Sequence, residues 1–209
     1  MTSTYKKMDV KERDQLYSIA KELGRNNPSG LYPFILMSDP NVHGDILSSV
    51  QNMPPQSTII YRHYGANDKA NIAKNLRQIT FERNQTFLIG HDPELAILYG
   101  ADGVHFKRDA ALAMPSLWRR RCPDWIITMA GLKGAQNYLD DISVLDAIFM
   151  SSVFPSQSSS AGPAIGQAAF QNLAELHSVP TIALGGITGT TAPQLMKTRA
   201  AGIAGRFRL

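Results

Sequence analysis

The stretch TFLIGHDPELAILYGADGVHF, residues 86–106, sets two short apolar runs around a helix candidate. TFLIG and GVHF are continuous apolar runs rather than alternating ones, which suits strands that are buried on both faces of a parallel sheet. PELAILYG, between them, is the helix candidate. The stretch therefore predicts one strand–helix–strand unit with its two strands parallel.

The same alternation extends along the chain in both directions. The other strand candidates are LYPFILMS (31–38), TIIYRHY (58–64), WIITMA (125–130), AIFMSSV (147–153), TIALGG (181–186) and GIAGRF (202–207). The other helix candidates are residues 68–84, 132–143, 166–178 and 191–201. Eight strands alternating with helices predict an α/β fold, a (β/α)8 TIM barrel over residues 30–209.

An open, doubly wound sheet is the structural competitor. Its dinucleotide-binding form carries a GxGxxG turn after the first strand, and this chain has Asp39–Pro40 there. The chain shows no linker, low-complexity tract or second zone of composition. One barrel domain is therefore the prediction.

Residues 1–29 are predicted to form an N-terminal helical extension. Asp9 can cap a helix that Gly24 ends, and Glu12 follows the cap by three residues. The apolar side chains that share one face are Leu16, Ile19, Ala20 and Leu23. Because no final helix follows the eighth strand candidate, we expect the N-terminal helix to cover the outer face beside strands one and eight.

Composition narrows the class of protein. The 209 residues carry 44% hydrophobic and 18% charged residues and a formal charge of +4, with Cys122 as the single cysteine. One cysteine excludes an internal disulfide framework and a cysteine-based zinc cluster. No apolar run reaches the roughly 20 residues of a membrane helix, and the N-terminus lacks a secretory signal. We expect a cytoplasmic protein without a membrane partner.

The basic residues are scattered, apart from Arg119–Arg120–Arg121. Such a run is more typical of a solvated helix end than of a segment that binds the phosphates of a nucleic acid, so no nucleic-acid partner is expected. The modest positive charge suits an anionic small molecule. Assembly into a homo-oligomer is left open.

Paired glycines end the seventh strand candidate. Gly185 and Gly186 lack side chains, so their backbone N–H groups can approach an anion, although the pair can also serve as a tight turn. The loops after strands seven and eight commonly hold a phosphate in barrels of this kind. The serine-rich loop 156–160 can add hydroxyl donors or act as a flexible lid. The phosphate-binding residues predicted from these loops are Ser156, Ser158, Gly185, Gly186, Gly205 and Arg206.

Three stretches resemble the thiamine-phosphate synthase and thiazole tautomerase superfamily. GADGVHF (100–106) is similar to its fourth strand, and MSSVFPSQSSSAGPAIG (150–166) to its sixth strand and following loop. VPTIALGGIT (179–188), followed by AAGIAG (200–205), is similar to its seventh and eighth strands. The resemblance implies a barrel that binds a small phosphorylated metabolite.

The resemblance also implies a transferase reaction of thiamine biosynthesis. In that family, hydroxymethylpyrimidine diphosphate is joined to thiazole phosphate with release of pyrophosphate. In the family, an arginine at the position of Arg62 binds the pyrophosphate. Two aspartates coordinate Mg²⁺, which prefers oxygen ligands. The first aspartate position falls on His91 and the second on Ala110. The metal candidates are therefore Asp92 and Asp109, each one residue out of register.

Other family positions differ as well. Ile60 and Tyr64 replace a glutamine and a lysine beside Arg62, Met129 replaces a serine, and Ser159 replaces a lysine. The cations that can neutralise a phosphate in place of magnesium are Lys107, Arg108, Arg206 and Arg208.

The catalytic residues stay unassigned, and three functions remain open. The first is a thiamine-phosphate synthase-like enzyme with Mg²⁺ as its cofactor. The second is a non-catalytic barrel that binds a phosphometabolite. The third is a thiazole isomerase (tautomerase), in which His91 or His63 would replace the proton-transfer histidine that falls on Gly131; His105, inside a strand, is expected to pack instead.

Overall fold

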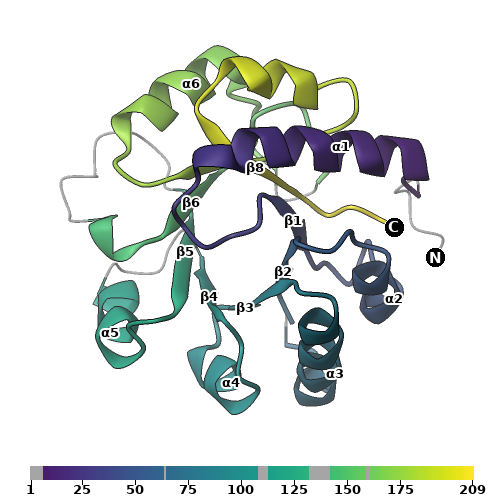
Figure 1. Ribbon diagram of the computed structural model, residues 1–209, viewed down its shortest axis with the longest axis vertical. Coiled ribbons are helices and arrows are strands. Elements are labelled where there is room, and N and C mark those ends of the chain that lie inside the picture. Colours follow the sequence, from purple (N-terminus) through teal and green to yellow (C-terminus); the bar gives the residue numbers. More distant parts are fainter. Residues whose placement is uncertain (1–6, 64, 108–112, 132–141, 159–160) are drawn as a thin grey trace.

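The computed structural model describes residues 7–63, 65–107, 113–131, 142–158 and 161–209. Eight parallel strands close into a barrel in chain order, as the sequence predicts (Figure 1). They are β1 (Phe34–Met37), β2 (Thr58–Tyr61), β3 (Thr86–Gly90), β4 (Gly103–Phe106), β5 (Ile126–Ala130), β6 (Ala147–Met150), β7 (Thr181–Leu184) and β8 (Ala200–Gly205). The (β/α)8 architecture is thus confirmed.

Helices surround the barrel (Figure 1). The α-helices are α1 (Val10–Leu23), α2 (Ile46–Gln51), α3 (Lys69–Glu82), α4 (Pro93–Leu98), α5 (Ala113–Arg121) and α6 (Gly166–Leu176). Short 3-10 helices are η1 (Gly24–Asn26), η3 (Ile142–Val144) and η4 (Ala192–Lys197). Most of the candidate at 132–143 lies outside the described residues. None of the described helices is long and apolar enough to cross a membrane.

The arginine run at 119–121 forms the last turn of α5, so the expected helix end is confirmed. Arg119 is not simply solvated there. Its guanidinium donates to the carbonyl oxygens of Trp125 and Val144 and pairs with Asp146. One of the three arginines therefore anchors α5 to the barrel instead of presenting a free charge.

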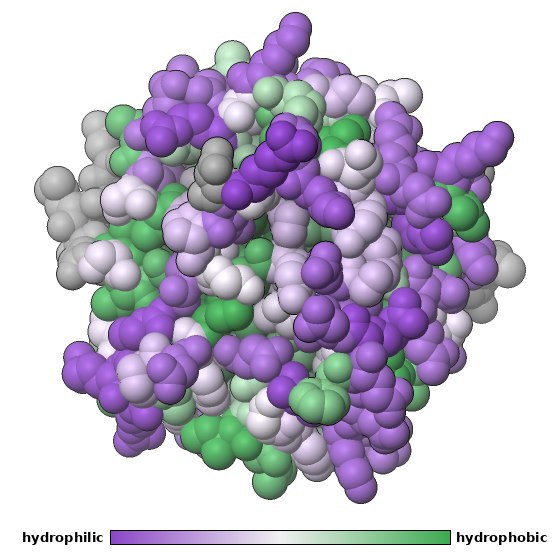
Figure 2. Space-filling model, viewed as in Figure 1, coloured by the Kyte–Doolittle hydropathy of each residue, from purple (hydrophilic) through white to green (hydrophobic). Residues whose placement is uncertain are grey.

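Two hydrophobic cores account for the continuous apolar runs. Side chains such as Ile35, Leu88 and Phe149 pack inside the barrel, whereas their neighbours along each strand pack against the helices. Both faces of the strands are thereby buried. Hydrophilic side chains cover most of the visible face, with hydrophobic ones in scattered patches (Figure 2).

His105 belongs to the core, as its place in a strand predicts. Its side chain is buried, its Nδ1 lies 2.9 Å from the Thr128 hydroxyl, and its ring meets the Phe149 ring edge-on. Burial lowers the pKa of His105 to about 3, with a smaller contribution from the charge of Arg62. The imidazole is therefore neutral near neutral pH and serves packing.

Helix α1 covers the outer face beside β1 and β8, as expected (Figure 1). Asp9 caps it by accepting a hydrogen bond from the Glu12 N–H, and Gly24 follows its last residue. The Met8 N–H donates to the Arg208 carbonyl at 2.8 Å. Helix α1 therefore packs against β8 and β1 from outside the barrel.

We expect Leu16→Ala to lower the free energy of unfolding by about 3 kcal/mol, because Leu16 is fully buried and the change leaves a cavity. Val10→Ala is the control in the same helix, since Val10 is 61% exposed, and it should change stability by less than about 0.5 kcal/mol. Urea titration of both variants measures the difference. Equal stabilities would show that α1 does not contribute to the core.

Candidate functional site

A cavity of about 530 Å³ lies at the carboxyl ends of β1, β2, β6, β7 and β8. The structure brings all of the predicted phosphate-binding residues together around it. They are Arg62, Ser156, Ser158, Gly185, Gly186, Gly205 and Arg206. Phosphate binding by these residues stays a prediction, but their shared position is what such a site requires.

Gly185 and Gly186 form a corner that only glycine fits. Both have positive φ angles, +94° and +67°, a conformation that costs other residues energy. A Cβ atom on Gly185 would lie 2.9 Å from the Ser152 Cα, and one on Gly186 would lie 2.4 Å from the Pro155 carbonyl oxygen. The corner is therefore packed backbone to backbone against the loop after β6.

Hydrogen bonds fix the peptide planes of this corner. The Gly185 carbonyl accepts from the Phe154 N–H at 3.1 Å, and the Gly186 carbonyl accepts from the Thr191 hydroxyl at 2.8 Å. In a trans peptide the following N–H points away from the carbonyl. The N–H groups of Gly186 and Ile187 are thus directed away from these partners, and both residues line the cavity. This geometry is suited to holding an anion by main-chain donors.

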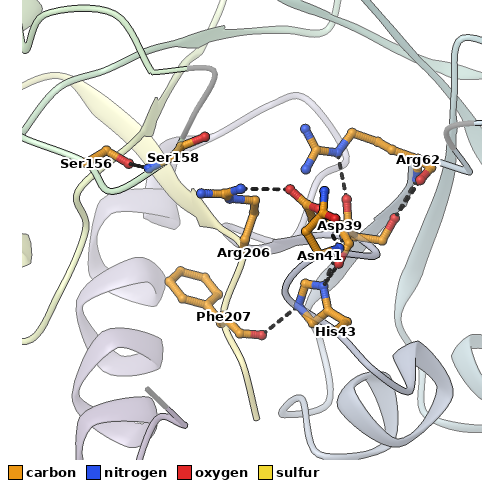
Figure 3. Close-up of polar contacts among 9 residues, drawn as sticks. Asp39, Asn41, His43, Arg62, Ser156, Ser158, Arg206 and Phe207 are labelled. Atoms are coloured by element: carbon orange, nitrogen blue, oxygen red, sulfur yellow. Dashed lines mark hydrogen bonds and ion pairs between the residues drawn. The ribbon is translucent and has the colours of Figure 1, made fainter. Parts of the chain in front are cut away.

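Two arginines enter the cavity from β2 and β8. The Arg62 Nε donates to the Ser38 carbonyl at 2.9 Å, and its backbone N–H donates to the Ser38 hydroxyl. A Cβ on Gly90 would come within 3.0 Å of the Arg62 Cγ, so the glycine leaves room for this side chain. Arg206 donates from Nη1 to Asp39 Oδ2 at 2.7 Å (Figure 3).

Asp39 is a cavity residue that the sequence analysis missed as a site residue. Its Oδ1 accepts from the Asn41 N–H at 2.9 Å, and its side chain is 11% exposed. Burial alone would raise the pKa of Asp39. The hydrogen bonds from Arg206 and Asn41, with the nearby charges of Arg206 and Arg62, hold that pKa below its ordinary value. Its signal was a carboxylate directly after the first predicted strand.

His43 ties the loop after β1 to the segment after β8 (Figure 3). Its Nε2 lies 2.9 Å from the Phe207 carbonyl oxygen, and its Nδ1 lies 3.0 Å from the Asp39 nitrogen. Burial lowers the pKa of His43, so the ring is neutral near neutral pH. His43 thus links the backbone of Asp39 to the backbone of Phe207, the residue after Arg206.

The N-terminal segment also reaches the cavity, which no sequence pattern indicated. Lys7, Met8 and Glu12 line it. The Glu12 carboxylate accepts from the Gly189 N–H at 2.9 Å, and the Gln15 amide donates to the Gly189 carbonyl at 2.9 Å. Helix α1 therefore braces the turn that follows the glycine corner.

Asp92, the magnesium candidate that the structure describes, has both carboxylate oxygens engaged by other groups of the protein. Asp92 Oδ1 caps α4 by accepting from the Leu95 N–H at 3.0 Å. Its Oδ2 is 2.8 Å from the Lys69 ammonium and 3.3 Å from His63 Nε2. Asp109 lies outside the described residues, and among those that are described no cluster of three or more His, Cys, Asp or Glu side chains could hold a metal. The Lys69 ammonium occupies the position beside Asp92 Oδ2 where a metal cation would have to bind.

The other candidates are dispersed. Arg208 lines the cavity, whereas Lys107, His63 and His91 do not. Arg108, Tyr64 and Ser159 lie outside the described residues. Met129 packs in the outer core instead of facing the barrel interior. Neither histidine considered for proton transfer thus stands in the cavity wall.

Comparison with known proteins identifies the family of this chain. The model of the thiamine monophosphate synthase family matches residues 35–207. A thiamine-phosphate synthase of Archaeoglobus fulgidus is 33% identical over 135 residues, which cover 64% of this chain and 62% of the relative. One of Oceanobacillus iheyensis is 26% identical over 183 residues, which cover 83% and 88%. The match to the first relative thus spans under two thirds of that protein.

A solved structure shares the fold. The thiamine phosphate pyrophosphorylase from Pyrococcus furiosus superposes with a TM-score of 0.71 at 23% identity, covering 85% of this chain and 87% of that one. The family model spans all eight strands except the first residue of β1. The chain therefore belongs to the thiamine monophosphate synthase family.

Proposed function

We propose that this protein binds a small phosphorylated metabolite in the cavity at the ends of β6, β7 and β8, and that it does so without magnesium. The observation that supports this proposal most directly is the net positive charge of the side chains that line the cavity. Among the described residues, four cations line it, Lys7, Arg62, Arg206 and Arg208, against the carboxylates of Asp39 and Glu12. An excess of positive charge beside main-chain donors suits a phosphate ester, which is a dianion near neutral pH.

The synthase reaction is a second candidate, favoured by the family and its relatives. In it, the pyrimidine C–O bond breaks, pyrophosphate leaves with the electron pair, and the thiazole nitrogen bonds to the pyrimidine methylene carbon. The rate of such a step depends on stabilising the leaving group. Here that support would come from Arg62 and other cations of the chain, since Asp92 is held by Lys69 and by the start of α4.

The isomerase alternative has less support. A general base must come within hydrogen-bond reach of the proton that it removes. His63 is paired with Asp92, and burial lowers its pKa, with a further lowering by the charge of Lys69. Because neither His63 nor His91 lines the cavity, a ligand held there would lack an imidazole base from these two residues.

Two measurements on the purified protein test the proposal. Calorimetry with inorganic phosphate and with thiazole phosphate should give affinities that change by less than about twofold when magnesium is replaced by EDTA. A coupled assay with both thiamine precursors should show no pyrophosphate release. Asp92→Asn serves as a control and should leave these affinities unchanged. Magnesium-dependent release of pyrophosphate would establish the synthase function instead.

A further inference from the structure

The cavity wall carries two carboxylates, Asp39 and Glu12, among its cations. Asp39 lies on the same wall as Arg206 and is almost buried, with 11% of its side chain exposed. An ionised carboxylate repels a phosphate, and the repulsion is stronger in a half-enclosed site than in water. The lowered pKa of Asp39 means that the group is ionised at neutral pH. Its presence thus disfavours a ligand that is only an anion.

Arg206 separates this carboxylate from the anion-binding loops. Its Nη1 donates a hydrogen bond to Asp39. In Figure 3 the guanidinium lies between Asp39 and the loop that carries Ser156 and Ser158. A guanidinium keeps its positive charge while it donates to a carboxylate, so Arg206 can hold Asp39 and still attract a phosphate in the same cavity. Asp39 thus lies on the side of Arg206 that faces away from this loop.

Asp39 keeps capacity to accept further hydrogen bonds. A carboxylate offers about four lone-pair positions. Among the described residues, Oδ1 accepts from the Asn41 N–H and Oδ2 from Arg206. One acceptor position on each oxygen thus remains for a donor that enters the cavity.

From this arrangement we propose that Asp39 is a specificity-determining residue, which selects phosphorylated ligands that also carry a hydrogen-bond donor such as an amine or a hydroxyl. The inference rests on the proposed function, because it assumes that the phosphate binds at the Gly185–Gly186 corner. A ligand of this class would place its phosphate beside Arg206 and its donor on the free edge of the Asp39 carboxylate. A ligand without a donor would leave that carboxylate facing an apolar group, which costs free energy.

The experiment compares three small esters that differ in the donor: ethyl phosphate, 2-hydroxyethyl phosphate and 2-aminoethyl phosphate. Their dissociation constants are measured by calorimetry or ligand-observed NMR on the full-length protein. The wild-type protein should bind the amino ester at least about tenfold more tightly than ethyl phosphate, with the hydroxy ester between them. Asp39→Asn should reduce the spread to within about threefold and leave ethyl phosphate binding similar or tighter.

The control is Asp45→Asn, which changes a carboxylate of the same loop that does not line the cavity and should keep the wild-type preference. Equal affinities of the three esters for the wild-type protein would overturn the inference without any variant. It would also fail if Asp39→Asn weakened all three esters equally, because Asp39 would then only position Arg206. Absence of binding by every ester would instead refute the proposed phosphate site itself.

Discussion

Replacing Arg206 by glutamine is expected to weaken phosphate binding by about 100-fold, because it removes charge-assisted hydrogen bonds from the anion. The same change should lower the free energy of unfolding by about 3 kcal/mol, since it strands a nearly buried carboxylate. The side chains of Arg206 and Asp39 are only 17% and 11% exposed, so water screens the pair weakly. Calorimetry and urea titration measure the two effects.

A double variant separates binding from stability. Asp39→Asn combined with Arg206→Gln replaces the ion pair by two neutral amides and should recover most of the lost stability. Phosphate affinity should stay low, because the cation is still absent. Wild-type affinity in the single Arg206→Gln variant would contradict a role for Arg206 in holding the anion.

The second large effect is expected for Gly186→Ala. A left-handed conformation costs a non-glycine residue roughly 1–2 kcal/mol. The new Cβ would also lie 2.4 Å from the Pro155 carbonyl oxygen and 2.7 Å from the Phe154 carbonyl carbon, both of which are main-chain atoms. We therefore expect a loss of about 3 kcal/mol or more in unfolding free energy, as for other strained sites, and no measurable phosphate binding.

Gly44→Ala is the matched control for that change. A Cβ on Gly44 meets no atom within 4 Å, and Gly44 does not line the cavity. Thermal unfolding of the two variants should therefore differ clearly, with Gly44→Ala close to the wild-type protein. A Gly186→Ala variant with wild-type stability would mean that the main chain of residues 154–155 relaxes easily, and the corner would not be a rigid anion site.

The fold was predictable because strands buried on both faces leave continuous apolar runs. TFLIG and GVHF become β3 and β4 with the same bounds. Helix α2, ILSSVQ, was not predicted, because its mixture of apolar and polar residues shows no helical period. The candidate at 191–201 forms the 3-10 helix η4 before β8, a choice that hydrophobic spacing does not decide.

The site was predictable only in part. Glycines at the end of a strand have a local signature, so Gly185 and Gly186 could be found from the sequence. Asp39 and Glu12 acquire their roles through partners that lie 167 and 177 residues away, Arg206 and Gly189. No local pattern encodes such a pairing. Asp92 was predicted as a metal ligand from its position in the sequence after the third strand. That position gives no sign of Lys69, whose ammonium donates a hydrogen bond to the Asp92 carboxylate in the folded protein.

The packing of α1 on β8 has a consequence for the order in which the protein can fold. The ribosome makes α1 first, whereas the strand that it covers emerges about 180 residues later, so this contact has a long sequence separation and forms slowly. Until then Leu16 and Ala20 lack their partners, and exposed apolar surface of this kind favours aggregation or capture by chaperones. A nascent chain that stalls before β8 would therefore expose the apolar face of α1 and would lack a completed binding pocket.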